Sequence, residues 1–145
     1  MLFGQLALID ASLCTGGLAI VSHAESPARL KMDDDRLLLI EFQETYPRAA
    51  QMQAPLSIIG GILGFLHWLI YGGLFWLFGT FFMSAIVLFT VVAIMPINKQ
   101  LMAMSTKNPV NSQSRKLIIR WGELHFIRTC FGFAAVLSFL IASLL

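Results

Sequence analysis

Charged side chains are scarce in this sequence, and so are the short motifs typical of soluble metalloenzymes and redox proteins. Only 12% of the 145 residues are charged, whereas a soluble domain usually carries about 25%. The two cysteines, Cys14 and Cys130, form no CxxC motif, and the histidines form no HExxH pair. With a mean hydropathy of +0.77, this composition excludes an ordinary soluble domain, and we expect no nucleic-acid partner.

Long apolar runs take the place of the missing charge. About 20 apolar residues are needed to cross the hydrocarbon core of a bilayer. Four runs reach this length, at about residues 2–22, 52–71, 74–95 and 119–143. The segments between them are too short for a separate soluble domain of usual size. We therefore predict a single all-α domain over residues 1–145, a four-helix transmembrane bundle in the lipid bilayer.

The basic residues predict how this bundle is oriented. Nine of the ten follow the first or the third run, with Arg120 at the start of the fourth: Arg29, Lys31, Arg36, Arg48, Lys99, Lys107, Arg115, Lys116 and Arg120. The positive-inside rule places both connections in the cytoplasm, so both termini face outward, and we expect the bacterial inner membrane. Between the first two spans, apolar and acidic residues mix over 36–46, which predicts a short cytoplasmic interfacial helix.

Two spans carry small residues at helical spacing, which lets helix backbones approach closely. Ala7, Ala11, Thr15 and Ala19 lie on the first span, and Ser57, Gly60, Gly61 and Gly64 on the second. We expect them to close the bundle, with a homodimer interface as the alternative.

One acidic residue, Asp10, lies midway along the first span, where an ionisable group is a functional hypothesis by default. Its nearest plausible partner is His67 on the second span. We expect an interhelical hydrogen bond between neutral forms, with a proton relay or a ligand site as the alternative.

The fourth span contains the most informative polar face. At about 100° per residue, Trp121, His125 and Arg128 share one narrow face of a helix. That face presents an aromatic ring, an imidazole and a fixed cation. Polar residues from the other helices are expected at the same level: His23, Glu25, Glu44, Tyr46, Arg48 and Asn98.

Three interpretations of this layer stay open. His23 and His125 with Glu25 or Glu44 have the ligand types for iron, copper or zinc, although their spacing forms no compact metal motif. The same residues could instead form a network of hydrogen bonds and ion pairs. The third interpretation is a metal-free site for an aromatic ligand, in which Trp121 stacks and His125 takes a proton.

At these residues the sequence also resembles the anthrone oxygenase-like family of small four-helix membrane proteins, from about His23 to the C-terminus. The stretches that carry the resemblance are Glu25-Ser26-Pro27-Ala28-Arg29, Phe42 with Tyr46, Arg48 and Ala49-Ala50, Gln53-Ala54, Pro96-Ile97-Asn98-Lys99-Gln100-Leu101, and Trp121-Gly122-Glu123-Leu124-His125-Phe126-Ile127-Arg128. The P-x-N-x-x-L and W-x-x-x-H-x-x-R patterns are the most specific of these.

The resemblance implies an oxygenase that converts the methylene of an anthrone into a quinone carbonyl with molecular oxygen. In that chemistry His125 would act as the base, and Arg128, Arg48 or Asn98 would stabilise the enolate oxygen. Trp121 and Tyr46 would hold the flat rings, with Glu25 beside them. Such a mechanism needs neither flavin nor haem, and a transition metal in the His23, His125 and Glu44 set stays open.

Two further interpretations belong to other functional classes. The chain could be a non-catalytic subunit of a homo-oligomer or of a larger membrane complex, in which case the polar groups should satisfy one another without a cavity. A transporter would depend on Asp10, but four short spans without an inverted repeat argue against it.

Overall fold

The computed structural model describes residues 2–107 and 113–145, and nearly all of these are helical. The elements are α1 (Leu2–Ile20), η1 (Val21–Glu25), α2 (Ser26–Arg29), α3 (Asp35–Tyr71), α4 (Leu74–Phe89), η2 (Thr90–Ile94), α5 (Met95–Ala103) and α6 (Gln113–Leu144). Because η1 and η2 join their neighbours without a break, the chain forms four long helices, each apolar enough to cross a membrane. The predicted all-α four-helix bundle is therefore confirmed.

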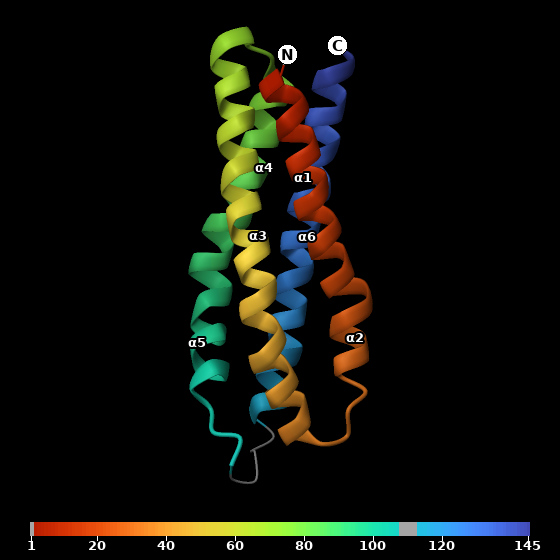
Figure 1. Ribbon diagram of the computed structural model, residues 1–145, viewed down its shortest axis with the longest axis vertical. Coiled ribbons are helices and arrows are strands. Elements are labelled where there is room, and N and C mark those ends of the chain that lie inside the picture. Colours follow the sequence, from red (N-terminus) through yellow and green to blue (C-terminus); the bar gives the residue numbers. More distant parts are fainter. Residues whose placement is uncertain (1, 108–112) are drawn as a thin grey trace.

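The four helices pack in an up-and-down arrangement. α1 packs against α3 and α6, and α4 packs against the same two helices, so that α3 and α6 lie on one diagonal. Figure 1 shows both termini at one end of the bundle and the ends of α2 and α5 toward the other. At the end with the termini, Gly72 and Gly73 connect α3 to α4 with φ of 74° and 94°. Residues with a side chain rarely adopt such positive φ angles, so glycine is required in this turn.

Two π-helical segments, η1 and η2, interrupt otherwise regular helices, and two prolines explain both. A proline within a helix clashes with the carbonyl four residues earlier. For Pro27 and Pro96 those carbonyls belong to His23 and Val92, which lie inside η1 and η2. The wider turns close with hydrogen bonds across five residues, from the Ser26 amide to the Val21 carbonyl and from Met95 to Thr90.

The short interfacial helix expected over residues 36–46 is not confirmed as a separate element. These residues form the first part of α3, which begins at the cap residue Asp34 and continues without a break past Pro47 and Pro55. Their apolar side chains Leu38, Leu39 and Phe42 are fully buried in the bundle. Because the bundle itself covers this face, the segment does not present it to the surface of a bilayer, although Leu37 remains exposed.

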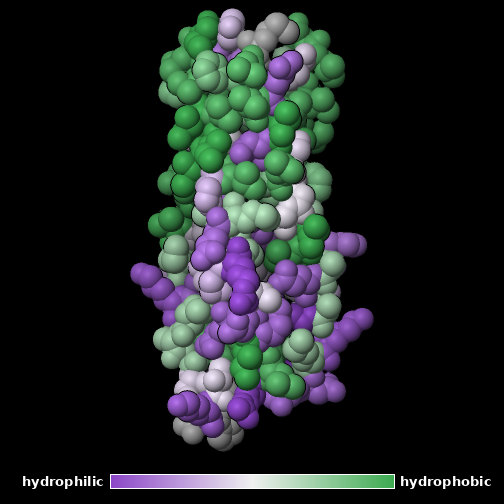
Figure 2. Space-filling model, in the orientation of Figure 1, coloured by the Kyte–Doolittle hydropathy of each residue, from purple (hydrophilic) through white to green (hydrophobic). Residues whose placement is uncertain are grey.

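The surface and the core both divide along the bundle axis. Figure 2 shows mostly apolar side chains over the half that carries the termini and mostly hydrophilic ones over the other half. Helix α3 has 37 residues, a length of roughly 55 Å at 1.5 Å per residue, whereas the hydrocarbon core of a bilayer measures about 30 Å. The helices are therefore longer than a membrane core requires, and the polar half holds the residues of interest.

Candidate functional site

His125 lies at the centre of the polar half, on α6, and its side chain is almost fully enclosed. Its exposed fraction is 1%. The imidazole Nδ1 lies 2.9 Å from the hydroxyl of Ser22, on η1. Trp121, one turn earlier on α6, makes the second contact: its ring stacks on the imidazole, with the two ring centroids 4.8 Å apart. These two contacts fix both the position and the tilt of the imidazole.

The Ser22 hydroxyl is part of a short chain of hydroxyl groups between η1 and α6. Its oxygen lies 2.8 Å from the Thr129 hydroxyl. The Thr129 hydroxyl also approaches the carbonyls of His125 and Leu18, at the longer distances of 3.2 and 3.3 Å. The wide turn of η1 places Ser22 against α6, in keeping with the frequent occurrence of π-helical turns at functional sites.

Asn98 links three helices beside this centre. Its side-chain amide donates to the Tyr46 hydroxyl on α3 at 2.9 Å. Its carbonyl accepts from the indole N–H of Trp121 at 2.8 Å. Phe42 completes the group, stacked on Tyr46 and edge-on to Trp121. Asn98 therefore holds the indole that in turn supports the His125 ring.

Arg128 is a second buried charge, one turn beyond His125. Its exposed fraction is 7%, and its guanidinium donates to the amide oxygen of Gln53 on α3 at 3.5 Å. Within the described parts of the chain it forms no salt bridge, and its Nε has no hydrogen-bond partner. Because ionisable groups inside a span are costly unless paired, an unpaired guanidinium is a candidate for binding or stabilising an anion.

Arg29 closes the layer on the side of the connections. Its guanidinium pairs with Glu25 and Glu41 and donates to the Thr45 hydroxyl at 2.9 Å. It also lies over the rings of Phe42 and Trp121, at 5.4 and 5.7 Å from their centroids. Arg29 thus links α2 to α3 and packs against the rings of Phe42 and Trp121.

The structure brings together part of the predicted site and leaves the rest outside. His125, Trp121, Asn98 and Tyr46 form one connected group, with Arg128 one turn away. Glu25 is connected to them through Arg29.

The structure does not bring Arg48 and Glu44 into the connected group around His125. They pair with each other on the outer face of α3, at 3.1 Å, with side chains 71% and 65% exposed. Tyr46 faces inward on the same helix, so residues two positions before and after it point away.

The predicted metal set does not assemble. His23 is exposed while His125 is enclosed, and Glu44 lies outside the bundle. Among the residues that the structure describes, no three histidine, cysteine or acidic side chains come together in a group that could hold a metal ion.

Asp10 and His67 contact different groups and not each other. Asp10 lies against Gly60, with its Oδ2 unpaired in the described part of the bundle. His67 contacts the rings of Trp76 and Tyr71, beside Gly4. Gly4 is six residues from Asp10, about 9 Å along α1. The expected hydrogen bond between Asp10 and His67 is thus not observed.

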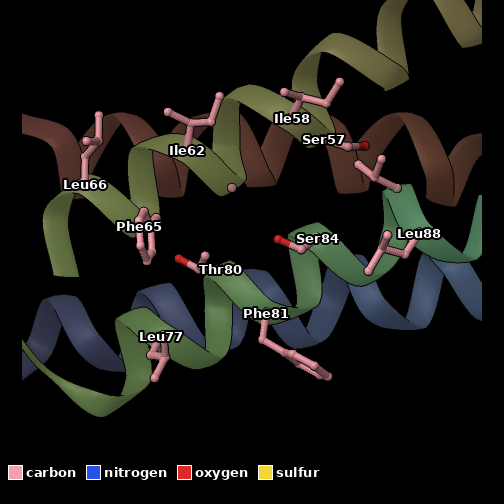
Figure 3. Close-up of a pocket in the computed structure, with 12 residues that line it drawn as sticks. Ser57, Ile58, Ile62, Phe65, Leu66, Leu77, Thr80, Phe81, Ser84 and Leu88 are labelled. Atoms are coloured by element: carbon pink, nitrogen blue, oxygen red, sulfur yellow. The ribbon is translucent and has the colours of Figure 1, made fainter. Parts of the chain in front are cut away.

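Three apolar grooves open on the outer surface of the described bundle, and two of them contain hydroxyl groups of interest. The larger, of about 650 Å³, lies between α3 and α4. Figure 3 shows its lining, with Ser57 on α3 and with Thr80 and Ser84 on α4 among large apolar side chains. The smaller, of about 420 Å³, lies between η1 and α6 and includes both Ser22 and Thr129. Of these two grooves, the second meets the hydroxyl chain that ends at His125.

Sequence reasoning missed four residues of this site: Ser22, Arg29, Gln53 and Thr129. Thr129 could have been found, because it is one turn from His125 on the same face. Arg29 and Gln53 belong to the stretches that resemble the family, but only their burial in the fold reveals their partners. Ser22 had no signal, since its position depends on the π-helical turn.

Comparison with known proteins gives one match. The family model described as anthrone oxygenase matches residues 42–138, which is most of the chain and includes Tyr46, Gln53, Asn98, Trp121, His125 and Arg128. No curated protein and no solved structure matches the chain.

Proposed function

The chain belongs to the anthrone oxygenase family, and we propose that it oxidises a hydrophobic phenolic ketone with molecular oxygen in the layer around His125. The observation that carries this proposal is the environment of the His125 imidazole. It is enclosed, fixed by Ser22 and Trp121, and one turn from a guanidinium that has no acidic partner in the described residues. The His125 imidazole can accept a proton from the substrate, and the uncompensated positive charge of Arg128 stabilises the anion that is left.

The reaction needs this anion. A methylene that is conjugated to a carbonyl through the fused aromatic rings of the ketone is acidic, and its enol form carries an aryl hydroxyl. Loss of one proton to the imidazole gives an electron-rich enolate. Its carbon adds molecular oxygen, and the resulting hydroperoxide loses water to form a second carbonyl. Overall, one CH₂ group and one O₂ give one C=O group and one H₂O, so no further reductant is required.

The protein groups divide into two roles in this proposal. His125 accepts the proton, and the charge of Arg128 stabilises the enolate. Trp121, Asn98 and Tyr46 are positioning residues, because their hydrogen bonds are already directed at one another and the indole supports the imidazole. The position of the basic residues at one end of the bundle further supports a cytoplasmic location of this layer.

The test is oxygen consumption by the purified protein in liposomes with anthrone as substrate. We expect His125→Ala to reduce turnover by about 10²-fold or more, the range for loss of a general base. His67→Ala is the matched control, because this imidazole lies at the other end of the bundle against Trp76. Equal loss in both variants, or full activity in His125→Ala, would remove His125 from the mechanism. Liposomes without protein give the rate of uncatalysed oxidation.

A second candidate function, a non-catalytic subunit of an oligomer, is favoured by the α3–α4 groove. A Cβ atom on Gly61 would contact Met83 and Ser84 only at ordinary distances of 3.6 and 3.8 Å, so the floor of this groove leaves room for an apolar side chain of another helix. Native mass spectrometry from gently extracted membranes distinguishes the two functions. Stoichiometric additional chains without any anthrone turnover would favour the subunit.

A further inference from the structure

We propose that the groove between η1 and α6 holds the aromatic substrate, taken up sideways from the bilayer, and that the Ser22 hydroxyl carries the substrate proton to His125. This inference rests on the proposed function and adds a binding site and a further catalytic residue to it. It depends on the lining of the groove, on the enclosure of His125 and on the direction of the hydroxyl chain.

The lining of the groove fits a flat, largely apolar molecule with one polar edge. Its walls include Ala19 and Ile20 from α1 and the rings of Phe126 and Phe133 from α6. The two phenylalanines are about half exposed, so their rings are available for stacking. Its volume of about 420 Å³ lies within the range of roughly 300–1,000 Å³ for small-molecule sites. An aromatic ketone of three fused rings matches this shape and polarity.

The polar atoms of this groove are concentrated where they connect to the base. Ser22 and Thr129 both line it, and their hydroxyl oxygens are 2.8 Å apart. His125 does not line the groove, and its exposed fraction is 1%. A molecule in the groove therefore reaches the imidazole through the Ser22 hydroxyl, which lies 2.9 Å from Nδ1.

The proton path uses one of the two directions open to the hydroxyl chain. The Ser22 and Thr129 oxygens lie 2.8 Å apart and either can donate, and Thr129 can also donate to the carbonyls of His125 and Leu18 at 3.2 and 3.3 Å. The path requires that the Ser22 hydroxyl donates to the lone pair of His125 Nδ1, in the tautomer with its proton on Nε2. Removal of the substrate proton then follows the same chain. The O–H bond of the enol form breaks, its proton moves to Ser22 Oγ, and the former Ser22 proton moves to Nδ1.

The larger α3–α4 groove provides the internal comparison. It also contains hydroxyl groups, at Ser57, Thr80 and Ser84, but Ser57 donates to the Gln53 carbonyl and lies 3.4 Å from the Cys14 thiol, so its partners include no imidazole. If volume alone decided where an aromatic molecule binds, the molecule would bind in the α3–α4 groove. The proposal predicts instead that it binds in the smaller groove between η1 and α6.

Photolabelling tests the binding site without requiring turnover. The full chain in phosphatidylcholine liposomes is irradiated with 2-azidoanthraquinone, and labelled peptides are mapped by mass spectrometry. We expect labels at residues 19–24 and 126–133 that unlabelled anthraquinone competes away. Ala19→Leu fills the groove and should lower this labelling at least fivefold. Ala85→Leu is the matched control, because Ala85 is also half-buried and lines a different groove, between α4 and α6.

Labels confined to the α3–α4 groove, or unchanged labelling in Ala19→Leu, would overturn the binding site. Anthrone turnover with such labels would leave the proposed function standing while this inference fails. Labels in the η1–α6 groove without anthrone turnover would support the site and refute the oxygenase activity.

Two substitutions of Ser22 test the proton path. Ser22→Ala should keep the photolabel and KM but lower kcat by about 10²-fold, the lower end of the range for general acid–base groups. Ser22→Thr retains a hydroxyl and should recover most of the loss. Unchanged kcat in Ser22→Ala would overturn the proton path, and so would loss of kcat that Ser22→Thr fails to recover while both variants keep the label.

Discussion

Replacing Asn98 with leucine tests the hydrogen-bonded support of the site most directly. Leucine has a similar volume but neither accepts from the Trp121 indole nor donates to the Tyr46 hydroxyl. Trp121 is only 4% exposed, so its N–H would lose its partner without access to water. An unsatisfied buried donor costs about 1–3 kcal/mol, and the loss at the half-buried Tyr46 adds about 0.5–1 kcal/mol, near the average for hydrogen bonds between membrane helices.

Together these terms predict that Asn98→Leu lowers the free energy of unfolding by about 1.5–4 kcal/mol. The assay is equilibrium unfolding in mixed micelles with increasing dodecyl sulfate, followed by circular dichroism. Tyr46→Phe is the control, because it removes only the weaker of the two bonds and should cost about 1 kcal/mol. If Asn98→Leu costs no more than Tyr46→Phe, the bond between Asn98 and the indole does not stabilise the bundle and our assignment of Asn98 is wrong.

Two further pairs of substitutions test packing and charge in the same assay. Gly79→Ala would place a methyl group 2.2 Å from the fully buried ring of Phe139 and should lower the free energy of unfolding by about 1–3 kcal/mol. Gly61→Ala is the control, because the nearest contact of its methyl group is 3.6 Å, and it should be neutral or stabilising. Equal effects of the two substitutions would refute the packing argument. Arg29→Met removes a buried guanidinium between two carboxylates and should cost about 2 kcal/mol, whereas Arg48→Met on the exposed pair should cost less than about 0.5 kcal/mol. A loss at Arg48 as large as at Arg29 would contradict the predicted difference.

The fold and part of the site could be predicted because they depend on regular periodicity. Hydropathy alone locates four membrane-length helices, and regular helical spacing brings Trp121 and His125 to one face. The level of Asn98 follows from its distance along its own helix. Each of these inferences uses only the geometry of one helix and the thickness of a bilayer.

The remaining features depend on departures from regular helices or on contacts distant in sequence. The π-helical turn at η1 changes the direction of Ser22 in a way that helical counting does not anticipate. Glu44 and Arg48 face outward because they lie two residues before and after Tyr46 on α3, which the prediction of their level alone did not take into account. Arg29 looked like one more basic residue of a connection, because its carboxylate and aromatic partners surround it only in the folded bundle.

The unpaired guanidinium of Arg128 has a consequence for how the protein is made. An arginine near the middle of a helix opposes membrane insertion by about 2.5–3.5 kcal/mol, and Arg128 lies half-way along α6, which leaves the ribosome after α1, α3 and α4. Its guanidinium donates to Gln53 on α3, and the groups around the neighbouring His125 and Thr129 come from α1 and η1. Synthesis from the N-terminus places α1 and α3 in the membrane before α6, so α6 inserts beside a surface that already offers partners for its polar face. The order of these helices along the chain thus makes insertion of the span that contains Arg128 easier.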